Sequence, residues 1–520
     1  MNTIDNQTNQ TLDLSEKIYE LNELSNLIQS LKSRDQKIVH CHGVFDLLHI
    51  GHIRHFEEAR KFGDILVVTI TQDQFVNKGP SRPAFTETLR AEAIAALQMV
   101  DYVAINNWPT AVKTIELLTP DYYVKGLEYN QTSNDRTGGI GPEEEAVQSV
   151  GGQLVFTDDI TFSSSSLINQ HLSAFPKDVS EWISGFASRH SSSEVLKYLD
   201  SARGIKVLVV GETIIDEYVY CDSLGKAGKE PVLVAREISS ERFAGGIVAV
   251  SNHISAVADS VSMLTFLGRT NSYEGIIRDN LNPRVHPEFL YKEGDSPTIV
   301  KRRFVENHPF QKLFEVYVMD DGENKASESQ EVFDKLESLI PNYDVVVVTD
   351  YGHGMLGPRE VELLCAESKF LAINTQVNAG NLGFNTVSKY RTADFICVSE
   401  KEIRLEARSR RKDLKDIVLD VSNQMGCDQI IITQGPQGCL CYTSQEGFTR
   451  VPALALEVVD RIGAGDAVFS VAALCAAQKA PAEITGFIGN VAGAEAVATV
   501  GNRDTLERIP FQRHIETILK

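Results

Sequence analysis

Apolar runs and amphipathic segments alternate along the first third of the chain. Apolar residues recur at helical spacing over residues 14–31, which predicts an amphipathic helix after a polar, disordered tail at residues 1–10. Five short apolar runs follow, separated by segments of helical length: residues 38–40, 65–69, 102–105, 122–124 and 154–156. Strands that alternate with helices predict a parallel sheet with helices on both faces. We therefore expect a tail and helix over residues 1–36 and a doubly wound α/β domain over residues 37–171.

The same alternation returns after a more polar stretch. Residues 172–204 contain Pro176, a run of serines and two helical patterns, and they are predicted to form a helical linker. Further apolar runs follow at residues 207–210, 262–265, 298–304, 344–349, 371–374, 395–398 and 429–433. Helical segments separate the later runs, and an apolar helix is expected over residues 467–476. Residues 205–520 thus predict a second doubly wound α/β domain.

Composition narrows the class of protein. The chain has 520 residues, of which 42% are hydrophobic, and no apolar run reaches the length of a membrane span. Its polar, acidic start is not that of a signal peptide. The net charge of −21 argues against non-specific binding to nucleic acid or anionic membranes. The eight cysteines lack metal-ligand spacing, so we expect reduced thiols in a cytoplasmic protein and no metal held by side chains alone.

The first candidate site lies between the first strand and the helix that follows it. His49 and His52 stand three residues apart where that helix is expected to start, so both share one face. A helix N-terminus offers free N–H groups and a positive dipole end, which suit phosphate, and Gly51 lets a ligand approach the backbone. Four preceding residues complete the motif: Gly43, Val44, Phe45 and Asp46. Although two histidines in a polar loop often have no chemical role, we interpret the complete motif as a site for a nucleoside triphosphate.

This stretch resembles the signature of the cytidylyltransferase-like nucleotidyltransferases, which implies a Rossmann-like domain. The resemblance implies that His49 and His52 stabilise the α-phosphate while a substrate phosphate attacks it and pyrophosphate leaves. It also implies a mobile basic loop with a catalytic lysine, a strand end that binds phosphate, and a serine-rich loop. The residues at these matching positions are Lys78, Arg82, Arg90, Lys125, Gly126, Ser163, Ser164 and Ser165.

A second candidate site lies at residues 460–466, just before the apolar helix. Gly463 and Gly465 at a helix start let backbone N–H groups point into one concavity, an anion hole. Asp466 at its edge can accept the proton of an attacking hydroxyl while the N–H groups take the charge that builds on a γ-phosphate. A glycine turn capped by an aspartate is the ordinary structural alternative. Asp216 is expected just past the strand at residues 207–210, where open α/β sheets bind ligands.

The residues around Asp466 resemble the signature of the ribokinase-like (PfkB) carbohydrate kinases, and the resemblance runs from residue 206 to about residue 510. It implies an α/β/α kinase that uses ATP, with Asp466 as the base and Mg²⁺ carried by the nucleotide phosphates; a monovalent cation is a further candidate ligand. The residues implied on the nucleotide side are Gly463, Ala464, Gly465, Thr433, Gly435, Gly438 and Ser399. Those implied on the sugar side are Asp216, Gly245, Gly246, Asn252, Lys301 and Arg303.

Together the two halves resemble the bifunctional heptose-phosphate kinase/heptose-1-phosphate nucleotidyltransferases of bacterial surface-polysaccharide synthesis, with the order of the halves reversed. Asn374, Ser399 and Ile462 stand where those enzymes carry Asp, Asn and Thr. The resemblance implies nucleotides and sugars or sugar phosphates as ligands. We also expect a homo-oligomer, for which residues 298–305 offer a candidate exposed strand.

Three functions stay open. The first is a bifunctional enzyme that phosphorylates a heptose-like sugar or sugar phosphate with ATP and transfers a nucleotidyl group from CTP or ATP to a sugar phosphate. The second is an active nucleotidyltransferase fused to a weak or inactive kinase-fold module that binds sugar or regulates. The third is a nucleotide-sensing scaffold with neither activity.

Overall fold

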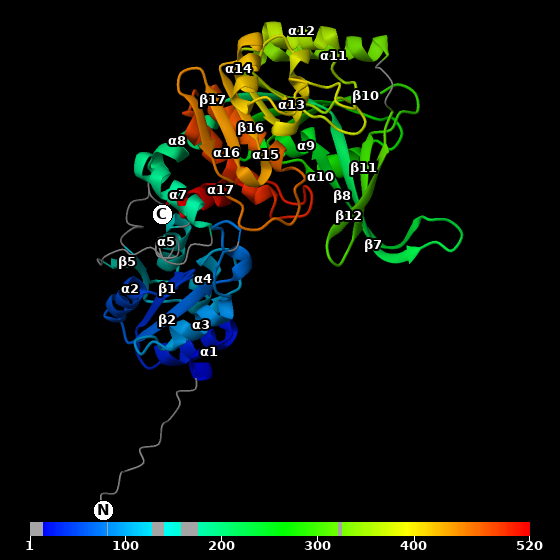
Figure 1. Cartoon of the computed structure of the whole chain (residues 1–520). Coiled ribbons are helices and arrows are strands. Elements are labelled where there is room, and N and C mark those ends of the chain that lie inside the picture. The colour runs from blue at the N-terminus through cyan, green and yellow to red at the C-terminus, as the bar shows by residue number, and fades with distance from the viewer. Residues whose placement is uncertain (1–13, 81, 127–139, 158–174, 321–324) are drawn as a thin grey trace, which may run out of the picture. The chain divides into compact units, whose positions relative to one another are not determined.

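The computed structural model describes residues 14–80, 82–126, 140–157, 175–320 and 325–520 (Figure 1). The chain divides into two compact units, of which the first is mainly Met1–Ala174 and the second mainly Phe175–Ile515. The predicted disordered tail at residues 1–10 lies outside the described residues. No helix in the described part of the chain is long and apolar enough to cross a membrane.

The first unit is built around one parallel sheet of five strands in the order β3-β2-β1-β4-β5. All five predicted strands are present, which confirms the doubly wound α/β class. Helix α1 covers one face, with Leu24 and Ile28 packed on Ile38, and α2 covers the other, with Phe56 packed on Val39. The elements in chain order are η1 (Leu14–Lys17), α1 (Leu21–Lys32), β1 (Ile38–Gly43), α2 (Ile50–Arg60), β2 (Ile65–Thr71), η2 (Asp73–Phe75), α3 (Glu87–Ala95), β3 (Tyr102–Asn106), α4 (Val112–Leu118), β4 (Tyr122–Gly126), α5 (Ile140–Ser149) and β5 (Gln153–Thr157).

The start of the first unit differs from the predicted continuous helix over residues 14–31. The helix begins only at Leu21, because the segment before it lies along strand β3, at the edge of the sheet. Ile18 bridges to Val103, and the N–H of Tyr19 donates to the carbonyl of Val103 at 2.9 Å. The ammonium of Lys17 donates to two carbonyl groups of the neighbouring turn, at 2.8 and 3.0 Å.

The second unit contains a sheet of nine strands in the order β10-β9-β6-β13-β14-β15-β16-β17-β18. The strands from β10 to β16 are parallel, and β17 and β18 continue the sheet in antiparallel pairs. Apolar strand residues such as Val348, Ile373 and Ile396 pack in one large core with helices α11, α12 and α14. The predicted apolar helix is present as α15, which lies beside α16.

The elements of the second unit in chain order are α7 (Lys177–Arg189), α8 (Ser192–Ala202), β6 (Lys206–Gly211), β7 (Thr213–Lys226), β8 (Leu233–Gly246), α9 (Ile247–Ser255), β9 (Ser260–Leu267), α10 (Glu274–Asn280), β10 (Val285–Tyr291), β11 (Ile299–Glu306), β12 (Gln311–Val318), α11 (Ala326–Leu339), η5 (Ile340–Asn342), β13 (Val345–Asp350), α12 (Pro358–Glu367), β14 (Leu371–Thr375), η6 (Val387–Lys389), β15 (Phe395–Ser399), α13 (Glu400–Glu406), α14 (Leu414–Met425), β16 (Gln429–Thr433), η7 (Gly435–Gln437), β17 (Cys439–Thr443), β18 (Gly447–Val451), α15 (Ala464–Ala477), α16 (Ala482–Ala496) and α17 (Arg508–Leu519). The helices α7 and α8, from the predicted linker, belong to this unit: Phe186 stacks on Phe487 with ring centroids 4.5 Å apart.

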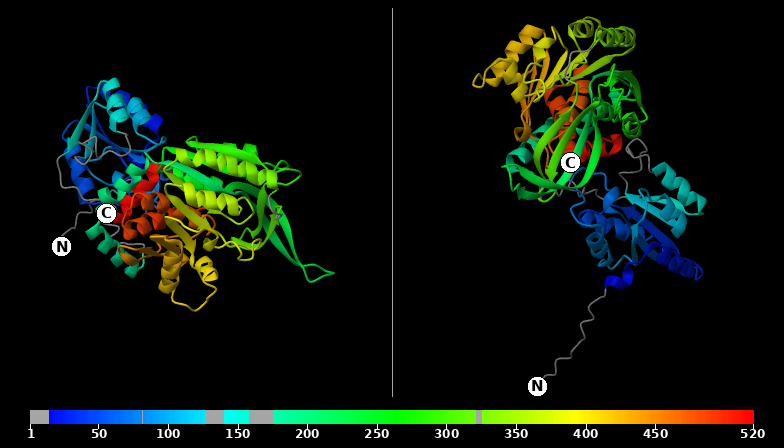
Figure 2. Two further views of the ribbon diagram at one scale, coloured as in Figure 1. Left: turned by 90° about the horizontal axis from the view of Figure 1, so that it is seen from above. Right: turned by 90° about the vertical axis from the view of Figure 1, so that its right-hand side faces the viewer.

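A second, four-stranded sheet in the order β12-β11-β7-β8 was not predicted. Strands β7 and β8 form a long antiparallel ribbon that projects from the rest of the unit (Figures 1 and 2). Two expectations are corrected here. Asp216 lies inside β7 rather than just past β6, because the chain turns into the new strand at Thr213. The segment expected as an exposed edge forms β11, which is an inner strand paired on both sides.

Candidate active sites

The loop between β1 and α2 brings the two histidines of the first unit together. His49 is the N-cap of α2, and its Nδ1 accepts a hydrogen bond from the N–H of Gly51 at 3.1 Å. Phe45 adopts a left-handed backbone with φ of 49°, and its ring contacts His52 at a centroid distance of 5.2 Å. A Cβ at Gly43 would lie 2.9 Å from that ring, so a larger residue there would displace the Phe45 ring.

The rings of His49 and His52 stack, with centroids 3.9 Å apart and planes 23° apart. In the described part of the chain, His49 Nε2 and His52 Nδ1 are buried without a hydrogen-bond partner. Burial lowers the pKa of both rings, and burial together with the charges of His49, His55 and Lys78 brings the pKa of His52 to about 3. Both imidazoles are therefore neutral at pH 7, and each neutral ring carries one N–H donor.

Asp46 joins this loop to the segment that follows the predicted basic loop. Its buried carboxylate accepts from the guanidinium of Arg82 at 3.2 Å and from the N–H groups of Ala84 and Phe85 at 2.6 and 3.4 Å. The charge of Lys78 is one of the causes that lower the pKa of His52. Arg82 thus contacts the histidine loop through Asp46.

Arg90, predicted as a nucleotide contact, lies behind the loop instead. Its side chain is buried and donates to the carbonyl groups of Val44, Phe85 and Thr71 and to the carboxylate of Asp73. Its guanidinium is therefore occupied by the protein, and it positions the turn that carries Val44.

Lys125 and Gly126 end strand β4, which neighbours β1, so they reach the same edge of the sheet as the histidine loop. Lys125 forms an ion pair with Glu143 at 3.0 Å. The pKa of His55 is lowered to about 4, first by burial of the ring and second by the positive charge of Lys125. His55 was not singled out from the sequence. Its Nδ1 lies 2.8 Å from Thr157 Oγ1, and its spacing three residues after His52 was the available signal. Three predicted residues, Ser163, Ser164 and Ser165, lie outside the described residues.

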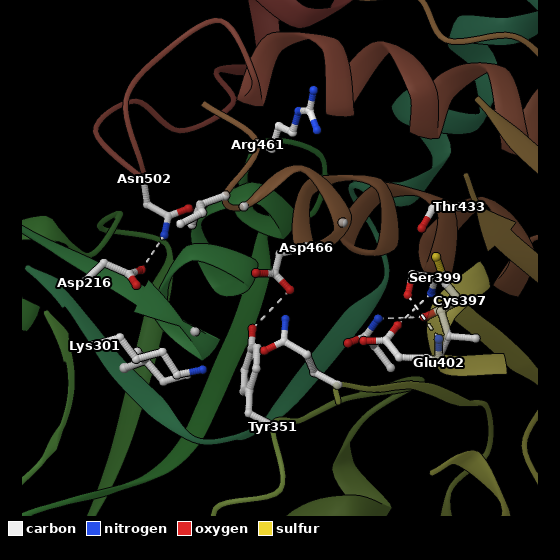
Figure 3. A pocket seen from close by; sticks show the side chains of 18 of the residues that line it. Asp216, Lys301, Tyr351, Cys397, Ser399, Glu402, Thr433, Arg461, Asp466 and Asn502 are labelled. Carbon is white, nitrogen blue, oxygen red and sulfur yellow. Dashed lines mark hydrogen bonds between the residues drawn. The ribbon is translucent and has the colours of Figure 1, made fainter. Parts of the chain in front are cut away.

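The second unit holds a cavity of about 280 Å³ at the carboxyl ends of β13 to β16, closed on another side by β7 and β11 (Figure 3). Its lining includes most of the predicted kinase residues: Asp216, Gly246, Lys301, Arg303, Ser399, Thr433, Gly463, Gly465 and Asp466. Of the other predicted residues, Gly245 packs behind Asp216, where a Cβ would lie 2.0 Å from a carboxylate oxygen. Ala464, Gly435 and Gly438 are near the site in sequence but are not among the lining residues.

Asn252 was predicted on the sugar side, and the structure places it elsewhere. Its amide donates to the carbonyl of Asn280 at 2.8 Å and accepts from the N–H of Asn282 at 2.9 Å. Because both ends of the amide are used, Asn252 ties α9 to the segment after α10 and does not line the cavity.

The predicted anion hole is the N-terminus of α15. Gly463 is its N-cap with φ of 83°, a left-handed conformation that favours glycine, and Gly465 faces open space. Asp466 follows in the first turn, and its carboxylate lines the cavity. Burial raises the pKa of Asp466 to about 7, while the hydroxyl of Tyr351, which donates to its Oδ1 at 3.1 Å, opposes that shift. A carboxylate with a pKa near 7 beside free N–H groups suits a general base.

Several charged side chains lie at the end of the cavity formed by β7 and β11, where sugar binding is predicted. Arg303 donates to Asp216 and, at 3.0 Å, to Glu315, while the amide of Asn502 donates to the second oxygen of Asp216 at 3.0 Å. Lys301 is different, because in the described part of the chain its ammonium has no ion pair and lies over the rings of Tyr317 and Tyr351. Asn502 was not singled out from the sequence.

The three residues that differ from the bifunctional enzymes, on the predicted nucleotide side, have structural contacts. The Ser399 hydroxyl caps α13 by accepting from the N–H of Glu402 at 3.3 Å, and the Asn374 amide donates to the carbonyl of Cys397 at 2.6 Å. Ile462 packs beside an apolar cluster that contains Tyr218 and Phe243. These three side chains therefore stabilise the cavity wall.

Two sequence families cover the two units. The model of the cytidylyltransferase-like family matches residues 40–171, and that of the pfkB family carbohydrate kinases matches residues 205–509. The second match spans more than half of the 520 residues, and the chain belongs to the pfkB carbohydrate kinase family.

Its relatives include proteins named bifunctional protein HldE. The one from Citrifermentans bemidjiense is 27% identical over 312 residues, 59% of this chain and 63% of the relative. The one from Koribacter versatilis is 41% identical over 157 residues, 30% of this chain and 31% of the relative. This chain is thus a homologue of the HldE proteins but matches less than two thirds of the length of either. A crystal structure of ribokinase from Thermotoga maritima aligns with 59% of this chain and 98% of its own, at 16% identity and a TM-score of 0.48.

Proposed function

We propose that this protein is a bifunctional enzyme of sugar-nucleotide synthesis. Its first unit transfers a nucleotidyl group from CTP or ATP to a sugar phosphate, and its second unit phosphorylates a heptose-like sugar or sugar phosphate with ATP. The observation that carries the proposal is the pair of sites: stacked neutral histidines with unpartnered nitrogens in one unit, and Asp466 beside a helix N-terminus in the other. The resemblance of the two halves to the bifunctional heptose enzymes, together with the partial similarity to HldE proteins, supports a heptose-like substrate and a role in surface-polysaccharide synthesis.

In the first unit, an oxygen of the sugar phosphate attacks the α-phosphorus, and the bond to the departing pyrophosphate breaks. His49 and His52 donate N–H groups to the α-phosphate oxygens, where negative charge grows, and the N-terminus of α2 adds its dipole. Lys78 neutralises the leaving pyrophosphate, and Lys125 faces the accepting phosphate. Arg82, Asp46 and Arg90 hold the loops that carry these groups.

In the second unit, Asp466 removes the proton from the attacking hydroxyl as it bonds to the γ-phosphorus, and ADP leaves. The N–H groups at the start of α15 take the charge that builds on the transferred phosphoryl group. Mg²⁺ bound to the nucleotide phosphates supplies further charge neutralisation. On this proposal the ion arrives with the nucleotide.

Lys301 supports a phosphorylated sugar as the kinase substrate, because its ammonium lines the cavity without a carboxylate partner among the described residues. The Lys301→Met variant is expected to raise KM for a sugar phosphate by roughly ten- to hundredfold, the size of a lost charge-assisted hydrogen bond. KM for the matching free sugar should change by less than about threefold. Steady-state ADP release with both sugars measures the difference.

The Lys335→Met variant, at a partly exposed position whose ammonium pairs with Glu288, is the control and should behave as wild type. Equal losses with the free and the phosphorylated sugar in Lys301→Met would contradict a phosphate-binding role.

A second candidate function is supported by the crowded sugar end of the cavity. Arg303 and Asn502 already occupy the carboxylate of Asp216, and three nucleotide-side residues differ from the pattern of the bifunctional enzymes. On this alternative the second unit binds sugar or regulates, and only the transferase is active.

One assay of the full-length protein decides between these functions. Nucleoside triphosphates are screened against sugar phosphates for pyrophosphate release, and millimolar ATP with Mg²⁺ is screened against hexoses, heptoses and their phosphates for ADP release. We expect pyrophosphate with CTP or ATP and slow ADP release with a sugar phosphate. Pyrophosphate without ADP would select the second function, and neither product would reject both.

We also propose a homo-oligomer in the cytoplasm. The β7–β8 ribbon carries exposed apolar side chains, among them Leu224, Leu233 and Ile238, and a two-stranded ribbon is marginal without further packing. These exposed side chains support contact between subunits through the β7–β8 ribbon rather than through β11. The eight cysteines are free thiols, which supports a reducing compartment.

A further inference from the structure

A buried tyrosine adjoins the candidate base of the second unit. Tyr351 follows strand β13, is 2% exposed, and donates its hydroxyl to Oδ1 of Asp466 at 3.1 Å. Figure 3 shows this bond, with the second carboxylate oxygen of Asp466 pointing toward the side of the cavity where Asp216 and Asn502 lie. The tyrosine therefore uses one oxygen and leaves the other for a substrate hydroxyl.

The backbone of Tyr351 is held from two sides. Its carbonyl accepts from the side-chain amides of Asn378 and Asn381 at 2.7 and 3.1 Å. Its N–H donates to the buried carboxylate of Glu212 at 3.0 Å, which also accepts from the N–H of His353 at 3.0 Å. The ring packs against Ile214 and Ile299. With backbone and ring both fixed, the hydroxyl has a fixed position relative to α15.

The groups around Asp466 set its pKa, and the hydrogen bond from Tyr351 acts against those that raise it. Burial raises the pKa of Asp466. Besides Tyr351, three titratable groups face its carboxylate: Asp216 from β7 and Glu402 from α13 raise the pKa, and Lys301 from β11 lowers it. Burial also raises the pKa of Tyr351 well above its usual range, so the hydroxyl stays a donor at every pH at which the protein is assayed. Loss of that donor leaves the carboxylate with less support for its charged form.

We propose that Tyr351 is a positioning residue for phosphoryl transfer: its hydroxyl orients the Asp466 carboxylate toward the acceptor hydroxyl and keeps it ionised near neutral pH. This inference rests on the kinase function proposed above. It assigns a role to a residue that is 115 positions away in sequence from the base it serves.

The test is the pH profile of the full-length Tyr351→Phe variant, which keeps the ring and removes only the hydroxyl. The acid limb of kcat/KM for ADP release should move upward by about one pH unit, because a hydrogen bond to a charged group is worth about that shift. The loss should be about tenfold at pH 6 and clearly smaller at pH 9, where Asp466 is ionised in both proteins. KM for ATP should stay the same.

Tyr390→Phe is the matched control, because Tyr390 is equally buried and donates to a different carboxylate, that of Asp350, at 2.8 Å. Its pH profile should not shift. A Tyr351→Phe profile with the wild-type acid limb, or a loss equal at every pH, would overturn the proposal. Asn378→Ala, which loosens the backbone clamp without touching the ring, should shift the limb in the same direction by less.

A second measurement does not depend on turnover. Carbon-13 NMR of aspartate-labelled protein, with the Asp466 carboxyl assigned by its loss in Asp466→Asn, should show a higher pKa of Asp466 in Tyr351→Phe. If that shift appears in a protein without kinase activity, the proposed function fails while the contact stands. If Asp466 titrates identically in both proteins, the positioning role fails whatever the activity.

Discussion

Replacement of Asp466 by asparagine is expected to lower kcat for phosphoryl transfer by roughly 10²–10⁴, the contribution typical of a general base. Asparagine has nearly the same shape but cannot take the proton of the acceptor hydroxyl. The helix N-terminus at Gly463 to Gly465 is unchanged, so ATP binding should stay within about threefold. ADP release in a coupled assay measures kcat, and equilibrium dialysis with ATP measures binding.

The role of Asp466 as base also predicts how the rate of phosphoryl transfer by the wild-type protein depends on pH. The base must be ionised, and the pKa of Asp466 is raised to about 7, so the rate should fall as pH drops below 7 and level off above it. Asp413→Asn is the control, because Asp413 also sits at a helix start but on α14. An Asp466→Asn protein that keeps a tenth or more of the wild-type kcat would remove Asp466 from the role of base.

The His52→Ala variant is expected to lower kcat for pyrophosphate release by roughly 10²–10³, the effect of losing one donor to a developing oxyanion. KM for the nucleotide should change much less, because the contact strengthens as charge builds in the transition state. Initial rates of pyrophosphate release with the nucleotide selected by the screen provide the measurement.

The neutral state of His52 also predicts the shape of the pH–rate profile for pyrophosphate release. Since its pKa is lowered to about 3, the ring does not gain a proton between pH 5 and pH 9, and no limb in that range should come from it. The exposed His286→Ala variant serves as the control and should turn over normally. Near-normal turnover in His52→Ala would mean that the stacked histidines take no part in the reaction.

Most strands of the five-stranded and nine-stranded sheets could be predicted because each is a short apolar run between helical segments, but β10, β17 and β18 were not predicted. The β7–β8 ribbon could not, since much of β8 is exposed and therefore has no continuous apolar run. Asp216 was placed beyond a strand end for this reason, although it does line the cavity.

The motif residues could be predicted as a set, but their individual environments could not. Arg90 and Asn252 are saturated by protein partners that no local pattern reveals. Asn502 escaped notice because its partner, Asp216, lies 286 positions away. Local patterns locate the elements, and long-range packing decides which side chains remain available for chemistry.

The segment before α1 has a consequence for the solubility of the first unit. An unpaired edge strand offers its free N–H and C=O groups to any other extended chain, which is a common start of aggregation. Strand β3 is such an edge, and the segment that carries Ile18 and Tyr19 occupies part of it by bridging to Val103. Lys17 adds a positive charge at the same border, where it discourages an incoming strand. These few residues therefore hinder the addition of a further strand to the sheet, and they also connect to the first helix.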